Sequence, residues 1–424
     1  MSAERFKYLI VFIFSFLLMD FYAFQAVRTV TQSIHPTLRK IIFFSYWGIT
    51  LAAVSGMIAA AATDFYAWPR HLRTYFFAFV LVLYLTKLFV ILPVLLEDIY
   101  RLFRYLFIQI KHLLYGKPPV SPQTSRGIPR SEFISRLALV FAAIPFSALV
   151  YGMIKGAYDY RVHRVKLKFP NLPMAFHGFR IVQLSDIHIG SFVSTRPLER
   201  AIRMVREENP DVIFFTGDLV NDIAKETDMF MEVLPELRAP HGVYSILGNH
   251  DYGDYFLWDN LHVKRANLNR LKEIHKNLGW KLLLNENTVI EREGDSIALI
   301  GVENWSRFKR FIRYGDMKKA YTGSENFPFK ILLSHDPSHW DTEITADYKE
   351  VDLTLSGHTH GMQMGVEIPG FKWSPVQYFY KHWAGLYQQG GQYLYVNRGL
   401  GFIGYPGRVG ILPEITVIEL ERQA

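Results

Sequence analysis

Apolar and polar positions are distributed differently in the two halves of the chain. Residues 8–24, 41–62, 74–96 and 133–154 are almost continuous apolar runs, whereas from residue 162 onward short apolar runs alternate with polar, helix-like stretches. About 20 helical residues cross the hydrocarbon core of a bilayer, so each long run is a candidate membrane span. Four such runs in succession favour a membrane bundle over buried helices of a soluble protein.

Two charged residues interrupt these runs. Asp20 lies in the first run and Lys87 lies near the middle of the third. A charge inside a membrane segment usually faces the bundle interior and pairs with another group. We therefore predict that Asp20 and Lys87 neutralise each other; the alternative is that each side chain extends separately to a membrane surface.

The domain organisation follows from the same pattern. Residues 1–155 are predicted to form a transmembrane domain, and residues 162–424 a second domain. Within the first, residues 97–117 carry basic side chains among Leu, Ile and Phe at helical spacing, which predicts an interfacial amphipathic helix. Residues 118–131, rich in Pro, Ser and Gly, are predicted to be a linker.

Composition narrows the possible functions. The formal net charge is +8, but residues 1–160 hold 16 Lys+Arg against 7 Asp+Glu, so the excess lies in the membrane half. We therefore expect no nucleic acid as a partner. The chain has no cysteine, which excludes disulfides, thiolate metal sites and cysteine nucleophiles.

Five short apolar runs in the second half each end in residues of metal-ligand type. Buried strands appear as continuous apolar runs, and sites in α/β proteins form just beyond the carboxyl ends of strands. These side chains are therefore expected to converge on one cleft. They are Asp186 and His188 after residues 180–184, Asp218 after 212–215, Asn249, His250 and Asp251 after 243–247, His335 after 331–333, and His358 and His360 after 353–355.

The order of these motifs resembles the calcineurin-like metallophosphoesterase family. The family pattern is Asp-x-His, Gly-Asp, Gly-Asn-His-Asp, a single His and Gly-His-x-His, and the resemblance covers roughly residues 162–420. Residues 357–363, 398–401 and 413–415 are similar to its membrane-associated or exported branch, which includes UDP-2,3-diacylglucosamine pyrophosphatase-like enzymes. Met362 departs from that branch, where a second glycine is usual. The resemblance implies an α/β fold, a four-layer α/β/β/α sandwich.

The resemblance also implies two divalent metal ions, which activate water for attack on phosphorus. Nitrogen and oxygen ligands suit Mn, Fe, Zn or Co, and their spacing does not select one of these metals. By the family pattern, the first metal is held by Asp186, His188 and His360, the second by Asn249, His335 and His358, and both by Asp218.

Other residues are predicted to act beside the metals. His250 is expected to donate a hydrogen bond or proton to the phosphate or leaving oxygen, and Asp251 to orient its imidazole. Arg398 and Arg408 are candidates for binding the substrate phosphate, with a structural role as the alternative. Residues 371–387 carry five Trp, Tyr and Phe side chains between positions 373 and 383, which suit contact with lipid or an acyl chain, or packing within the domain.

These observations predict a multi-pass protein of the cell (inner) membrane that hydrolyses a phosphoester or pyrophosphate bond. The proximity of the fourth span to the second domain favours a phosphorylated, lipid-linked or membrane-surface substrate. The alternatives are a nucleotide–lipid pyrophosphatase facing the cytoplasm, a tethered general phosphodiesterase or phosphatase, and a non-enzymatic scaffold. Basic residues in the loops favour a catalytic domain on the outer, periplasmic face, and the oligomeric state is left open.

Overall fold

The computed structural model describes residues 3–63, 65, 68–116 and 130–423. The chain divides into two compact units, Met1–Tyr151 and Gly152–Ala424. Four helices are long and apolar enough to cross a membrane. They are α1 (Ala3–Val30), α2 (Pro36–Ala62), α3 (Arg70–Tyr115) and α4 (Arg130–Ile154), in agreement with the four predicted spans.

Helix α3 is longer than the predicted third span. It continues without interruption to Tyr115, so residues 97–115 extend this helix and do not begin a separate one. No glycine or proline lies between residues 94 and 115 to end it, and Pro93 is accommodated inside the helix. Residues 117–129, which include most of the predicted linker, lie outside the described residues. A position of residues 97–117 at the membrane surface stays a prediction.

The predicted pair of membrane charges is present. The fully buried carboxylate of Asp20 accepts hydrogen bonds from Lys87 Nζ, from Thr50 Oγ1 at 2.8 Å and from Tyr84 OH at 3.0 Å. Tyr46 OH donates to the backbone oxygen of Asp20 at 2.8 Å. Polar groups from α1, α2 and α3 thus satisfy one another's hydrogen-bonding capacity away from water, as buried polar groups in a hydrocarbon environment must.

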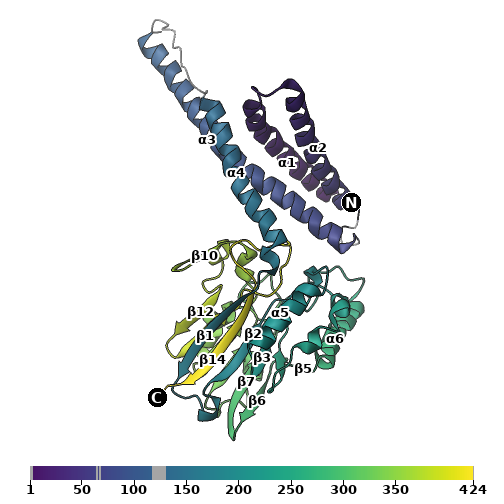
Figure 1. The fold of residues 1–424 in the computed structure, drawn as a ribbon, viewed down its shortest axis with the longest axis vertical. Coiled ribbons are helices and arrows are strands. Elements are labelled where there is room, and N and C mark those ends of the chain that lie inside the picture. The colour runs from purple at the N-terminus through teal and green to yellow at the C-terminus, as the bar shows by residue number, and fades with distance from the viewer. Residues whose placement is uncertain (1–2, 64, 66–67, 117–129, 424) are drawn as a thin grey trace. The chain divides into compact units, whose positions relative to one another are not determined.

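The second unit is built on two six-stranded sheets, seen in Figure 1. The first has the order β1 (Arg161–Phe169), β14 (Glu414–Arg422), β2 (Phe179–Leu184), β3 (Val212–Phe215), β4 (Val243–Ser245), β5 (Trp280–Leu282). The second has the order β12 (Gly385–Gln389), β13 (Gln392–Val396), β9 (Leu353–Ser356), β8 (Lys330–Leu333), β7 (Asp295–Gly301), β6 (Glu286–Arg292). Both sheets are mixed, because parallel central strands are joined by antiparallel ones.

Three hydrophobic clusters hold these layers together. Phe179, Phe214 and Ile331 belong to the cluster between the two sheets. The outer face of the first sheet packs on α5 (Arg196–Glu207) and α6 (Leu261–Asn277). The outer face of the second packs on α7 (Met317–Tyr321) and the turn Trp340–Ile344. The predicted four-layer α/β/β/α sandwich is confirmed.

Candidate metal centre

The loops that follow β2, β3, β4, β8 and β9 carry the candidate ligands. β2, β3 and β4 are parallel neighbours in one sheet, and β8 and β9 are parallel neighbours in the other, so these loops converge. Two glycines allow the close approach. A Cβ on Gly248 would overlap the Asp218 carboxylate, and a Cβ on Gly357 would overlap that of Asp186.

The backbone at the candidate ligands is strained. Asp186, His188, Asp218, His358 and His360 all have left-handed φ angles, between 45° and 70°. Such a conformation costs an L residue about 1–3 kcal/mol and persists only where neighbouring contacts impose it. Five strained residues in one cluster mark it as a functional site rather than ordinary packing.

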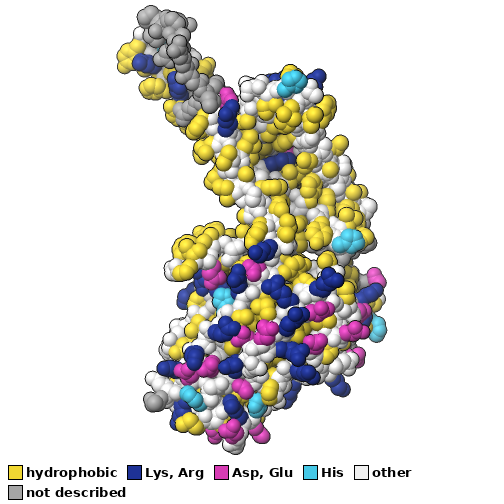
Figure 2. Space-filling model, in the orientation of Figure 1, with side chains coloured by type: hydrophobic (Ala, Val, Ile, Leu, Met, Phe, Trp, Pro, Cys, Tyr) yellow, Lys and Arg dark blue, Asp and Glu magenta, His cyan; other side chains and the backbone are white. Residues whose placement is uncertain are grey.

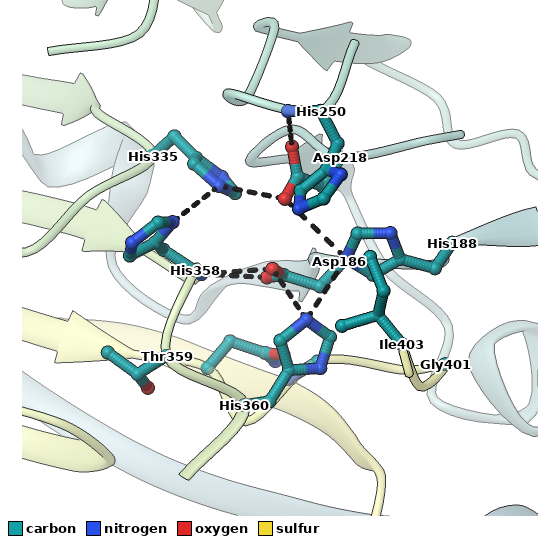
Figure 3. Close-up of polar contacts among 12 residues, drawn as sticks. Asp186, His188, Asp218, His250, His335, His358, Thr359, His360, Gly401 and Ile403 are labelled. Carbon is teal, nitrogen blue, oxygen red and sulfur yellow. Dashed lines mark hydrogen bonds and ion pairs between the residues drawn. The ribbon is translucent and has the colours of Figure 1, made fainter. Parts of the chain in front are cut away.

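Three buried side chains form the first ligand cluster, shown in Figure 3: Asp186, His188 and His360. The Nε2 atoms of His188 and His360 lie 3.0 Å apart, and His360 Nε2 lies 3.2 Å from Asp186 Oδ1. Three ligand atoms directed at one point are the arrangement that holds a divalent cation.

Asp218, His335 and His358 form the second cluster. His335 Nε2 lies 3.2 Å from Asp218 Oδ2 and 3.3 Å from His358 Nδ1. The same oxygen, Asp218 Oδ2, lies 3.5 Å from His188 Nε2 in the first cluster. One carboxylate oxygen is therefore placed between the two groups, where it could contact two cations.

Hydrogen bonds orient the histidines of the second cluster. His335 Nδ1 lies 2.7 Å from the backbone oxygen of Thr216, which can only accept, so Nδ1 carries a proton and Nε2 is the nitrogen whose lone pair becomes available when the ring is neutral. Tyr380 OH donates to Asp336 at 3.1 Å and lies 2.8 Å from His358 Nε2. This hydroxyl therefore accepts a hydrogen bond from His358 Nε2–H, and Nδ1 is the nitrogen that faces the cluster.

Asn249 provides a test of whether a metal fits this site. Its Oδ1 is buried and has no hydrogen-bond partner among the described residues, while its Nδ2 donates to Tyr255 OH at 3.1 Å. A buried amide oxygen without a partner is costly unless something binds it. A cation beside the second cluster would satisfy this oxygen, so the residues present fit a metal.

The charges of the cluster are strongly coupled. Burial alone would raise the pKa values of Asp186 and Asp218, but the neighbouring histidines hold both pKa values well below the ordinary range. Burial would lower the pKa of His335, but the Asp218 carboxylate raises it to about 10. Burial lowers the pKa of His358 to about 4, which keeps that ring neutral. Anionic carboxylates and a neutral imidazole are the ligand forms that metals bind.

His250 lies beside the metal clusters and lines the cavity above them. Its ring centre is 5.0 Å from that of His188, and its Nδ1 lies 2.7 Å from the backbone oxygen of Asn221. Because that oxygen can only accept, Nδ1 is the donor and Nε2 is left for another partner. The predicted orientation by Asp251 is wrong, since the Asn221 carbonyl holds this ring.

Asp251 has a different place in the structure. Its buried carboxylate accepts four backbone N–H groups, from Asp218 and Leu219 at 2.8 Å, Gly248 at 2.9 Å and Val220 at 3.2 Å. It therefore joins the loop after β3 to the loop after β4. The geometry makes it a support for Asp218 rather than a catalytic group.

Comparisons with known proteins bear on this geometry. A family model described as probable calcineurin-like phosphoesterase, transmembrane domain, matches residues 5–157, and one described as calcineurin-like phosphoesterase matches residues 179–362. The phosphodiesterase YaeI of Escherichia coli (strain K12) is 30% identical over 295 residues, which are 69% of this chain and 99% of YaeI. The chain belongs to the calcineurin-like metallophosphoesterases. The predicted family is thus confirmed, and with it a metal-dependent phosphoesterase domain on a multi-pass membrane protein.

Two further proteins show the range of relatives. A Danio rerio protein named transmembrane protein with metallophosphoesterase domain is 32% identical over 293 residues, 68% of this chain and 62% of that protein. The chain thus spans less than two thirds of that relative's length. LpxG of Chlamydia trachomatis, named UDP-2,3-diacylglucosamine pyrophosphatase, is 29% identical over 290 residues, 57% of this chain and 83% of LpxG.

The two arginines predicted to bind phosphate contact other protein groups in this metallophosphoesterase. Arg398, 3% exposed, pairs with both Glu367 and Glu414. Arg408, 1% exposed, donates to the backbone oxygens of Gly401 and Gly399, and its Nη2 lies 3.1 Å from His360 Nδ1. Neither lines the cavity, which favours the structural alternative for both. Arg408 instead lies behind a candidate metal ligand.

The cavity above the clusters has a volume of about 280 Å³. Four of its lining residues, Met362, Val376, Phe379 and Tyr380, lie at the departing motif position or in the aromatic stretch 371–387, whereas Arg310, Phe311 and Ile403 lie outside the segments that the sequence indicated. Residues 307–313, with the sequence Arg-Phe-Lys-Arg-Phe-Ile-Arg, mix basic and apolar side chains. This pattern is the sequence signal that could have indicated Arg310 and Phe311.

Proposed function

We propose that this chain hydrolyses a phosphoester or phosphoanhydride bond of a lipid-linked or membrane-surface substrate, using two divalent metal ions. The observation that carries the proposal is the position of Asp218 Oδ2 within 3.5 Å of histidine nitrogens from both ligand clusters. A single carboxylate oxygen shared in this way is typical of a two-metal site.

The ligands in this proposal are those predicted from the motifs. Asp186, His188 and His360 would hold one ion, Asn249, His335 and His358 the other, and Asp218 both. When bound, the two ions would polarise a phosphoryl oxygen and the attacking water. The nitrogen and oxygen donor set suits Mn, Fe, Zn or Co.

His250 is the proposed proton donor. With Nδ1 donating to the Asn221 carbonyl, the protonated ring directs a second N–H, at Nε2, away from the backbone. That proton passes to the leaving oxygen as the phosphorus–oxygen bond breaks, which prevents release of a free alkoxide or phosphate anion of higher charge.

The lining of the cavity favours an amphiphilic substrate. Phe311, Met362, Val376 and Phe379 are apolar, and Arg310 is the cation among the lining residues that the structure describes. An apolar wall beside a phosphate-binding centre suits a lipid-linked phosphate. The name of LpxG supports a lipid-linked pyrophosphate, and the name of YaeI supports a tethered phosphodiesterase as the second candidate.

Hydrolysis by the full chain in lipid nanodiscs loaded with Mn²⁺ tests the proposal. Phosphate or nucleotide release would be measured from a lipid-linked pyrophosphate and from bis(p-nitrophenyl) phosphate. Asp218→Asn should reduce turnover of every accepted substrate by at least about 10³-fold, roughly 4 kcal/mol in the barrier. Asp228→Asn, a change at a half-exposed surface carboxylate, is the matched control. Full activity of the Asp218→Asn protein would refute the assignment.

The side of the membrane determines which substrates can reach the site. We propose the outer face, because the Lys and Arg residues between positions 97 and 130 then lie on the cytoplasmic side, as such residues usually do in membrane proteins. Reporters active on only one side, fused after residue 424, would test this. A cytoplasmic reporter signal would overturn the proposed orientation and favour a nucleotide–lipid pyrophosphatase.

A further inference from the structure

A small hairpin beside the cavity exposes large apolar side chains. β10 (Val366–Ile368) pairs antiparallel with β11 (Phe371–Trp373), and in the described part of the chain neither strand joins a larger sheet. We call the exposed apolar residues of this region the hairpin face. Its members, 44–73% exposed, are Met362, Val366, Ile368, Phe371, Tyr378 and Phe379. Figure 2 shows hydrophobic side chains gathered over β10.

A basic loop, residues 307–313, is attached to the hairpin face. Arg307 Nη2 donates to the backbone oxygen of Phe379 at 2.8 Å, and the ring of Phe308 lies 5.0 Å from that of Tyr380. Arg307, Lys309 and Arg310 are all exposed. The loop contains no Asp or Glu, and no ion pair involves these three cations in the part of the chain that the structure describes.

The hairpin face also connects directly to the end of the fourth apolar helix. The backbone N–H of Arg408 donates to the oxygen of Gly152, near the end of α4, at 3.2 Å. The next residue, Val409, donates to Gln363 and accepts from Gly365, both at 2.8 Å. β10 begins one residue later, so the hairpin starts where the chain leaves a predicted membrane span.

We propose that the hairpin face and the basic loop rest on the membrane surface and bind anionic phospholipid headgroups. Exposed aromatic and aliphatic side chains suit the boundary between headgroups and acyl chains. Each Lys or Arg near an anionic bilayer strengthens binding about fivefold. The surface therefore combines the two attractions that one partner, an anionic bilayer, satisfies together.

This placement would put the mouth of the cavity at the level of the headgroups. Met362 and Phe379 belong to both the hairpin face and the cavity lining, and Arg310 belongs to both the basic loop and the lining. A lipid-linked molecule could then reach the metal clusters by a lateral movement, without leaving the bilayer. The contact goes beyond the proposed hydrolysis and does not depend on it.

The absence of cysteine makes the contact directly measurable. Phe371→Cys in the full chain would be labelled with a fluorophore and placed in nanodiscs of neutral phosphatidylcholine or of its mixture with anionic phosphatidylglycerol. Lipids with a nitroxide near the headgroup would quench a label that touches the surface. Met174→Cys, at a position 65% exposed outside the hairpin face, is the matched control.

We expect strong quenching at position 371, greater in anionic discs and reduced by salt, and little at position 174. Equal quenching at both positions would overturn the proposal. So would a label at 371 that stays unquenched while the unlabelled Phe371→Cys protein, treated with a thiol oxidant, forms a disulfide with a second copy, because the face would then be a dimer interface.

The charge contribution is tested separately in the Phe371→Cys background. Lys309→Gln, which leaves the Arg307 hydrogen bond to Phe379 in place, should weaken quenching in anionic discs by up to about fivefold in the equilibrium for contact, and leave it unchanged in neutral discs. An equal effect in both kinds of disc would show that this cation acts on folding of the loop, and would overturn the role of anionic lipid.

Discussion

Replacement of Asp251 by Asn distinguishes a support for the metal loops from a catalytic partner of His250. One carboxylate oxygen accepts the N–H groups of Asp218 and Gly248, and the other accepts those of Leu219 and Val220. An Asn side chain keeps one acceptor oxygen and presents an NH2 group in place of the other. Two buried N–H groups would therefore lose their acceptor.

The expected destabilisation follows from these contacts. A buried N–H group left without an acceptor costs about 1–3 kcal/mol, so the loss of two lowers the free energy of unfolding by about 2–6 kcal/mol. At about 2 °C per kcal/mol for a unit of this size, the Tm should fall by at least about 4 °C.

Thermal unfolding of the full chain in detergent, followed by tryptophan fluorescence, would measure this shift. Asp228→Asn is the control, because its half-exposed pair with Arg270 contributes about 0–1 kcal/mol. The reasoning is refuted if Asp251→Asn unfolds at the wild-type temperature while losing activity, since the carboxylate would then act on His250 and not on the loops.

Three further predictions follow from contacts described above or close to them. Gly156→Ala places a Cβ against the backbone oxygen of Arg408, in the loop behind the metal clusters, so the amount of bound Mn²⁺ measured by elemental analysis should fall severalfold. Gly391→Ala is the control, because the space around Gly391 is open and this variant should bind Mn²⁺ normally. In the metal-free protein the pKa of His335 is raised from 6.5 to about 10, so the stabilisation that its protonation gives is complete below pH 6.5 and is lost as the pH rises through 10. The Tm measured in EDTA should therefore fall between pH 6.5 and 10. Metal bound at His335 Nε2 should remove this pH dependence. Asp20→Asn and Lys87→Met should each destabilise the bundle by about 3–5 kcal/mol, and the double variant by less than the sum, as measured by unfolding in SDS; additive losses would contradict the pair.

The parts of the site that the sequence predicted share one property. Each candidate ligand follows a buried strand within a few residues, so local order places it at a strand end, as for Asp186 after β2 and His335 after β8. The membrane spans were predictable for a similar reason, because hydrophobicity over some 20 residues is a local quantity. The pairing of Asp20 with Lys87 could be predicted because burying a single charge in a membrane is so costly that two such charges are expected to pair.

The departures from these predictions concern partners that are distant in sequence or chosen by three-dimensional geometry. Arg398 pairs with Glu367 and Glu414, on elements whose proximity depends on the fold of the whole domain. Asp251 is adjacent to His250 in sequence, but its carboxylate turns toward four backbone N–H groups that no residue pattern records. Adjacency to His250 in the sequence was therefore a poor guide to the contacts of Asp251.

The position of β14 has a consequence for how the chain becomes folded. This strand lies between β1, to which it is parallel, and β2, to which it is antiparallel, with Glu414 paired to Arg161 across 253 residues. Until residue 422 has left the ribosome, β1 has no partner strand and β2 presents an open edge, long after the four apolar helices have been made. Contacts of such long sequence separation form slowly. Truncation within β14 should therefore leave a membrane-inserted chain whose first sheet is divided in two, a species prone to edge-to-edge association and to proteolysis.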